Sequence, residues 1–123
     1  NAERFIVVQI EDPEPLGQLD EICQLPGIDM IFFGPGDFSQ GAGVSCEWDS
    51  SVIDETRRLV AKTARKYDKF AGTVGGTGNF DDLVKIGYNF ISLGADVVGL
   101  ISYFKDIVSK SEMKKAVAYN EIE

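Results

Sequence analysis

Four short apolar runs recur along the chain, at residues 5–10, 28–33, 70–74 and 90–93. Each run is long enough for a buried strand and too short for a buried helix. Most of the segments between them carry apolar residues every three or four positions, as on one face of an amphipathic helix. Strands that alternate with helices in this way predict a parallel sheet whose strands are joined by right-handed crossovers.

The predicted helices follow the four strands in turn. They occupy residues 12–24, 50–68, 79–86 and about 97–108, with further helix around residues 112–119. The helix at residues 50–68 has the clearest pattern, and its basic side chains are predicted to face water. These basic residues stand at positions 57, 58, 62, 65 and 66.

Four βα units make half of a (β/α)8 barrel, which typically takes about 250 residues. An open four-stranded parallel sheet is the competing fold. A half barrel alone would expose two sheet edges and the apolar interior of the ring. We therefore expect residues 1–123 to be completed by an N-terminal half, by another chain or by self-association. The strand that begins almost at once, with no initiator Met, is read as part of a longer chain.

The amino-acid composition limits the classes of molecule that the chain is expected to bind. The net charge of −8 and the pI of about 4.5 argue against nucleic acid and anionic membrane surfaces, which need a basic footprint. The apolar window at residues 90–108 contains Asp96, Lys105 and Asp106, so it is not read as membrane-spanning. Cys23 and Cys46 show no metal-binding spacing and are expected to be reduced thiols in a cytoplasmic protein.

Candidate chemistry lies where the predicted strands end, since parallel α/β folds build their sites at the C-terminal ends of strands. Gln9 and Glu11 end the first strand, and the second runs into Gly34-Pro35-Gly36-Asp37. If these two strands are neighbours, the carboxylates of Glu11 and Asp37 can converge. Two neighbouring carboxylates cannot both stay charged unless they bind a cation, and otherwise they share a proton. A site with only two protein ligands suits Mg²⁺ or Mn²⁺, because water and substrate supply the remaining ligands.

Simpler interpretations of the same residues remain open. Glu11 can be a solvated residue at a strand end, and Asp37 can cap a short helical turn at residues 38–40. The glycine cluster at residues 75–78 can bind phosphate through its N–H groups, although a turn between strand and helix is the more common use. Asp96 is expected to cap the last helix, and Trp48 to pack or to border an interface.

Several segments resemble the HpcH/HpaI aldolase family, whose members are metal-dependent class II aldolases acting on 2-oxo acids. The similar segments are Val8-Gln9-Ile10-Glu11, Leu19-Asp20-Glu21-Ile22, Pro26-Gly27-Ile28-Asp29 and Gly34-Pro35-Gly36-Asp37-Phe38-Ser39, together with the strand around Gly72 and the Gly87 to Asp96 ending. The resemblance extends over essentially the whole chain and matches the C-terminal half of the family's (β/α)8 barrel.

The resemblance implies a role for each matching residue. Glu11 and Asp37 match the ligands of the divalent metal, Mg²⁺ or Mn²⁺, and Gln9 matches a residue that contacts the substrate. Gly36 stands where the family usually has Ala or Ser, whose backbone N–H helps to hold the carboxylate of pyruvate. The family's catalytic His and substrate-clamping Arg come from the N-terminal half, and this chain has no histidine at all.

The function expected from this resemblance is a metal-dependent carbon–carbon lyase that cleaves or forms 2-oxo acid aldols through a pyruvate enolate. The catalytic base is expected to come from the N-terminal half, and family members often form oligomers. Two alternatives stay open: a phosphate-binding barrel enzyme that uses Gly75 to Gly78 without a metal, and a non-catalytic half barrel that only associates.

Overall fold

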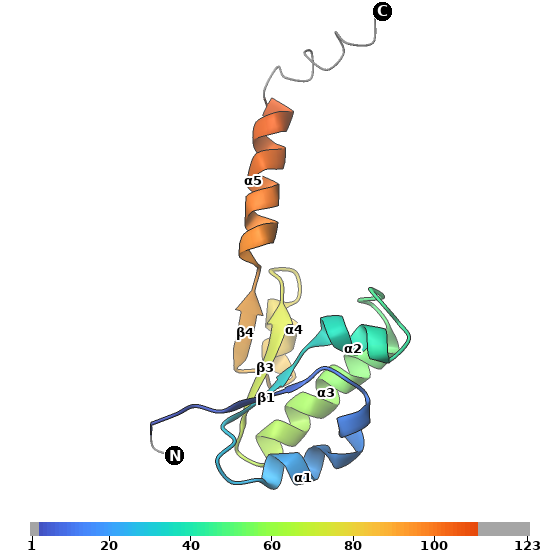
Figure 1. Cartoon of the computed structure of the whole chain (residues 1–123), viewed down its shortest axis with the longest axis vertical. Coiled ribbons are helices and arrows are strands. Elements are labelled where there is room, and N and C mark those ends of the chain that lie inside the picture. The colour runs from blue at the N-terminus through green and yellow to red at the C-terminus, as the bar shows by residue number, and fades with distance from the viewer. Residues whose placement is uncertain (1–2, 111–123) are drawn as a thin grey trace, which may run out of the picture. The chain divides into compact units, whose positions relative to one another are not determined.

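The structure, a computed structural model, describes residues 3–110 (Figure 1). It divides into two compact units, with the boundary between Leu93 and Gly94. The first unit contains β1 (Val7–Ile10), the 3-10 helix η1 (Glu14–Gln18), α1 (Leu19–Gln24), β2 (Met30–Phe33), α2 (Pro35–Gly41), α3 (Ser51–Lys66), β3 (Phe70–Gly75), α4 (Phe80–Lys85) and β4 (Phe90–Leu93). The second contains α5 (Asp96–Lys110).

The four strands form one parallel sheet in the order β1-β2-β3-β4. Ile10 pairs with Phe33, Phe33 with Thr73, and Thr73 with Ile91, so the register is continuous across the sheet. The C-terminal ends of consecutive strands therefore lie side by side at one edge. The predicted alternation of strands and helices, and the parallel sheet that it implies, are both confirmed.

The two faces of the sheet have different surroundings. On one face, the fully buried Ile31 and Phe33 pack into a core that includes Ile53 and Val60 of α3. The opposite face carries the in-register row Gln9, Phe32, Gly72 and Phe90. This second face includes large apolar side chains that are about half exposed, namely Val7, Phe70, Val74 and Phe90. It is the apolar surface that a half barrel was expected to leave open.

Two helical regions differ from the sequence prediction. The first predicted helix is a 3-10 helix, η1, followed by the short α-helix α1. A helix also forms directly after β2, where a turn was expected. Pro35 occupies its first position, which needs no N–H donor and suits the fixed φ of proline. Asp37 therefore lies within the first turn of α2 and does not cap a turn at residues 38–40.

Helix α5 lies in the second unit. All of its residues are exposed, and they include Val97, Leu100, Ile101, Phe104 and Ile107. Within residues 3–110, no helix is long and apolar enough to cross a membrane. The further helix predicted around residues 112–119 lies outside the described residues.

Candidate functional site

The end of β1 places two of the predicted site residues together. Gln9 lies on the strand, and Glu11 follows it two positions later on the same face. The amide Nε2 of Gln9 donates a hydrogen bond of 2.6 Å to Oε2 of Glu11. This hydrogen bond holds the Glu11 carboxylate in position. Both side chains are exposed, so the carboxylate remains open to solvent.

The end of β2 lies directly beside this pair. The N–H of Gly34 donates to the carbonyl of Ile10 over 2.9 Å, which keeps the two strand ends together one residue beyond β2. Asp37 then stands exposed in the first turn of α2. Ser39 Oγ donates to the carbonyl of Gly36 over 2.7 Å and fixes the same turn. The structure thus brings the Glu11 and Asp37 segments to neighbouring strand ends.

The space beside Gly34 is filled by the Gln9 and Glu11 side chains. A Cβ at this position would lie 2.8 Å from Gln9 Nε2 and 3.4 Å from Glu11 Cβ. A side chain at Gly34 would therefore displace the Gln9 amide from its hydrogen bond. At Gly36 a Cβ would meet no atom within 4 Å, so this glycine is not required by packing.

The two predicted ligands, Glu11 and Asp37, would form only a weakly chelated site for a hard cation. Among residues 3–110, no group of three or more His, Cys, Asp or Glu side chains could hold a metal ion. Glu11 and Asp37 would therefore supply two carboxylates and leave the remaining positions to water and substrate. Mg²⁺ is bound in this manner in many sites, and Mn²⁺ shares its preference for oxygen. That the two carboxylates share one ion remains a prediction.

The glycine cluster after β3 forms a closed turn. Gly75 ends the strand, and the N–H of Gly76 donates to Asn79 Oδ1 over 2.8 Å. This N–H already has an acceptor within the turn, so it is not a free donor for phosphate. Asp96 begins α5, where its Oδ1 accepts a hydrogen bond of 2.7 Å from the N–H of Val97.

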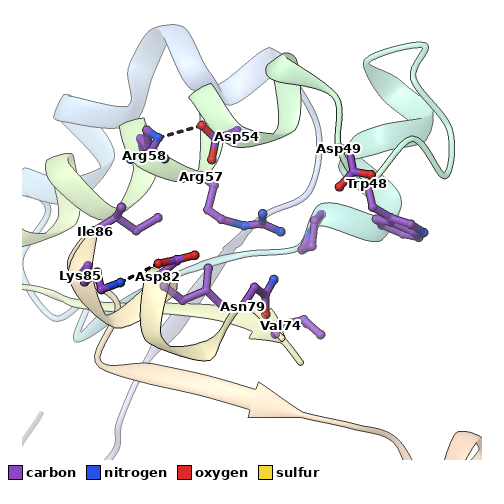
Figure 2. A pocket seen from close by; sticks show the side chains of 13 residues that line it. Trp48, Asp49, Asp54, Arg57, Arg58, Val74, Asn79, Asp82, Lys85 and Ile86 are labelled. Atoms are coloured by element: carbon purple, nitrogen blue, oxygen red, sulfur yellow. Dashed lines mark hydrogen bonds and ion pairs between the residues drawn. The ribbon is translucent and has the colours of Figure 1, made fainter. Parts of the chain in front are cut away.

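Sequence reasoning missed a pocket of about 770 Å³ between α3 and α4 (Figure 2). Its lining includes Trp48, Arg57, Val74, Asn79 and Leu83. Arg57 was predicted to face water, and this is wrong: its side chain is partly buried and its Nε is fully covered. The helical pattern could not reveal this, because the covering groups come from elements distant in the sequence.

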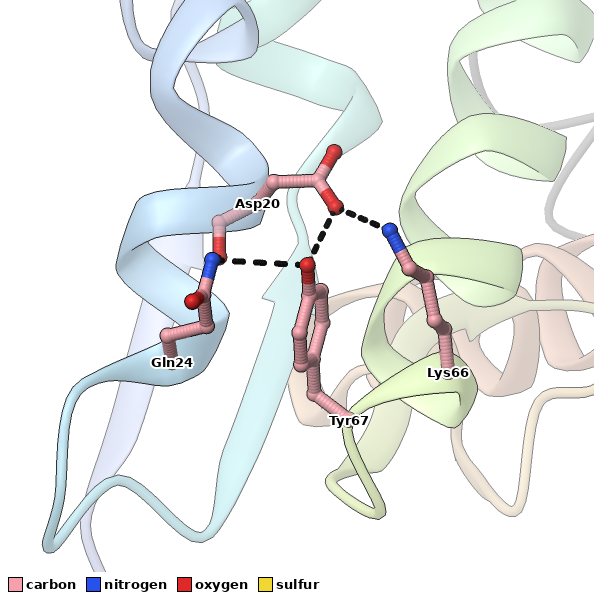
Figure 3. A network of polar contacts seen from close by, with 4 residues as sticks. All are labelled: Asp20, Gln24, Lys66 and Tyr67. Atoms are coloured by element: carbon pink, nitrogen blue, oxygen red, sulfur yellow. Dashed lines mark hydrogen bonds and ion pairs between the residues drawn. The ribbon is translucent and has the colours of Figure 1, made fainter.

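A separate polar network joins α1 to the end of α3 (Figure 3). Oδ1 of Asp20 accepts hydrogen bonds from Lys66 Nζ over 2.6 Å and from the hydroxyl of Tyr67 over 2.7 Å, and Gln24 contacts the same hydroxyl. The hydrogen bond from Lys66, followed by that from Tyr67, lowers the pKa of Asp20 below its ordinary value. We interpret this network as a structural link between two helices.

Known proteins share both the sequence pattern and the fold. The family model for HpcH/HpaI aldolase/citrate lyase matches residues 1–102. A 2-keto-3-deoxy-L-rhamnonate aldolase of Escherichia coli O6:K15:H31 (strain 536 / UPEC) is 29% identical over 102 residues, which are 80% of this chain and 37% of that protein. The chain thus spans well under half the length of this relative.

Two solved structures have the same fold. An HpcH/HpaI aldolase/citrate lyase family protein from Burkholderia cenocepacia J2315 superposes with a TM-score of 0.82 at 21% identity, over 89% of this chain and 43% of its own. An HpcH/HpaI aldolase from Desulfitobacterium hafniense DCB-2 gives 0.79 at 24% identity, over 85% and 41%. These matches confirm the expected α/β fold of four βα units from a (β/α)8 barrel. With the family model matching most of its length, the chain belongs to the HpcH/HpaI aldolase/citrate lyase family.

Proposed function

We propose that the chain is part of a metal-dependent aldolase, a carbon–carbon lyase that cleaves or forms 2-oxo acid aldols through a pyruvate enolate. The observation that carries this proposal is the adjacency of β1 and β2, whose ends bear the exposed carboxylates Glu11 and Asp37. Family membership supports the reaction class, and one relative is named as an aldolase of a 2-keto acid.

In this proposal Glu11 and Asp37 hold Mg²⁺ or Mn²⁺. When bound, the cation supplies Lewis-acid stabilisation of the negative charge that develops on the ketone oxygen of the substrate. Gln9 donates to Glu11 and so orients this carboxylate, in addition to the substrate contact expected of it. Gly36 lies in the first turn of α2, where N–H groups lack acceptors within the helix, and its N–H binds the substrate carboxylate.

Histidine, the commonest acid–base residue, is absent from this chain, and the base is expected from elsewhere. We propose that an N-terminal half of the barrel supplies the base and covers the open apolar face of the sheet, and that the complete enzyme is a homo-oligomer. A non-catalytic half barrel is one alternative. Activity recovered on adding the N-terminal half would exclude the non-catalytic alternative, whereas a correctly assembled but inactive barrel would support it.

The test of the metal site is calorimetric titration of Mg²⁺ and Mn²⁺ into the wild type and Asp37→Ala. The variant should lose metal binding and keep its circular dichroism spectrum, since Asp37 is exposed. Glu21→Ala, which removes an exposed carboxylate from α1, should bind metal as the wild type does. Unchanged metal affinity in Asp37→Ala would reject this assignment.

A further inference from the structure

The lining of the pocket between α3 and α4 contains neither of the proposed metal ligands, although it includes Pro35, the residue directly before Gly36. It opens beside the end of β3, and its walls include Trp48 and Asp49 from the loop before α3, and Asn79 from the turn before α4. None of Gln9, Glu11, Gly36 and Asp37 lines it. With about 770 Å³ it is large enough for a small organic ligand.

Three cationic side chains line this pocket, and two of them are already paired. Arg58 Nε donates to Asp54 over 2.8 Å, and Lys85 Nζ donates to Asp82 over 2.9 Å. The remaining cation is the guanidinium of Arg57. It makes no side-chain hydrogen bond or ion pair with the residues that the structure describes.

The position of Arg57 is fixed by the core below it. The buried Tyr88 donates its hydroxyl to the backbone carbonyl of Arg57 over 2.8 Å, which holds this turn of α3 against the core. Nε of Arg57 is fully covered and has no acceptor among residues 3–110. A permanently charged group with an unsatisfied covered donor is unfavourable unless an acceptor is bound nearby.

Asn79 adds a second donor on the opposite wall. Its Oδ1 accepts the N–H of Gly76, and this fixes the orientation of the amide. The NH₂ group is thereby left to donate elsewhere. Figure 2 shows Arg57 reaching from α3 and Asn79 from the turn before α4 towards the space between the two helices.

We infer that this pocket binds a small oxyanion, a carboxylate or phosphate group, between the guanidinium of Arg57 and the amide nitrogen of Asn79. A guanidinium presents parallel N–H donors that match two oxygens of either group. Asp49 also lines the pocket and has no partner among the described residues, so its negative charge would oppose the binding of an anion. The site does not depend on the proposed metal chemistry.

The test titrates inorganic phosphate and succinate separately into the full chain, with EDTA present and with chloride at matched ionic strength as the reference. Trp48 is the only tryptophan and lines the pocket, so its fluorescence reports occupancy directly, and calorimetry gives the affinity. A saturable change with phosphate assigns a phosphate group, and one with succinate assigns a carboxylate. A response to neither anion overturns the inference.

Three variants test whether the anion binds at Arg57. Arg57→Gln should weaken binding at least tenfold, and Asp49→Asn should strengthen it several-fold because it removes the opposing charge. Lys62→Gln changes the net charge equally from an exposed position on α3 outside the pocket, and should stay within twofold of the wild type. Wild-type affinity in Arg57→Gln, or an equal loss in Lys62→Gln, would contradict a site at Arg57.

A second variant covers the case in which Arg57→Gln does not fold. Arg57→Lys keeps the charge and loses the planar fork, so it should bind with an affinity between those of the wild type and Arg57→Gln. Thermal unfolding monitored by circular dichroism identifies which variants are folded. A folded Arg57→Lys that binds with wild-type affinity would exclude recognition through the guanidinium.

Discussion

Gly34→Ala tests whether Gln9 positions Glu11 for a metal. The added Cβ would lie 2.8 Å from Gln9 Nε2, whereas non-bonded atoms of this size prefer about 3.5 Å or more. The Gln9 amide must therefore move by more than about 0.5 Å. Because its hydrogen bond to Glu11 is 2.6 Å long, we expect this movement to break or misalign the bond.

The expected consequence is a loss of metal affinity without a loss of fold. Removing a partner that orients a metal ligand typically costs about 10- to 100-fold in affinity. Gln9 and Glu11 are both exposed, so we expect the lower end of this range, about tenfold or about 1.4 kcal/mol. Calorimetric titration of Mn²⁺ measures the change, and circular dichroism checks the fold.

Gly36→Ala is the matched control two residues away. A Cβ at Gly36 meets nothing within 4 Å, so this variant should bind Mn²⁺ within about twofold of the wild type, well below the effect of losing an orienting partner. An unchanged affinity in Gly34→Ala would refute the argument that Gln9 orients Glu11. An equal loss in both variants would show that the turn as a whole, and not the Gln9 contact, controls binding.

Three further predictions concern stability, each measured by urea denaturation. Tyr88→Phe should lower the free energy of unfolding by about 1 kcal/mol, because it removes a hydrogen bond. Burial raises the pKa of Tyr88, so the contribution of this residue to stability is present below about pH 10 and is lost as the pH rises further. Ile53→Val, at a fully buried site, should cost about 1 kcal/mol, while Val52→Ala, at an exposed neighbouring site, should cost less than about 0.5 kcal/mol. The hydrogen bond from Lys66 is the main cause of the lowered pKa of Asp20, so the folded state favours the charged carboxylate. The resulting contribution to stability is present above about pH 4 and is lost as the pH falls through the folded pKa. Asp20→Asn should therefore reduce the fall of the unfolding free energy at acidic pH. A Tyr88→Phe variant as stable as the wild type, equal losses at positions 52 and 53, or an unchanged fall at acidic pH in Asp20→Asn would contradict the respective argument.

The sheet could be predicted from local pattern because each strand is a short apolar run, and three of the four strands have buried residues. The apolar runs at residues 28–33 and 70–74 enclose β2 and most of β3, and the βα alternation fixes parallel strands. The helix after β2 could not be predicted in the same way. Gly34, Pro35 and Gly36 are typical of a turn, yet proline is also favoured at the first position of a helix, and the structure realises this second use.

The candidate metal site depended on one long-range fact that sequence alone does not contain, namely that β1 and β2 are neighbours. The structure supplies this adjacency and the hydrogen bond from Gln9 to Glu11. The pocket at Arg57 had no signal in the sequence. In the sequence, Arg57 is one of several basic residues on the polar face of a helix. Only its packing against elements distant in the sequence distinguishes it from the others.

The most direct measurement is a crystal structure of the complete barrel with Mn²⁺ and pyruvate or oxalate, with the ion located by its anomalous scattering. Our account predicts one Mn²⁺ ion that is bound directly by carboxylate oxygens of both Glu11 and Asp37. An ion bound elsewhere, or one that contacts neither residue, would contradict it.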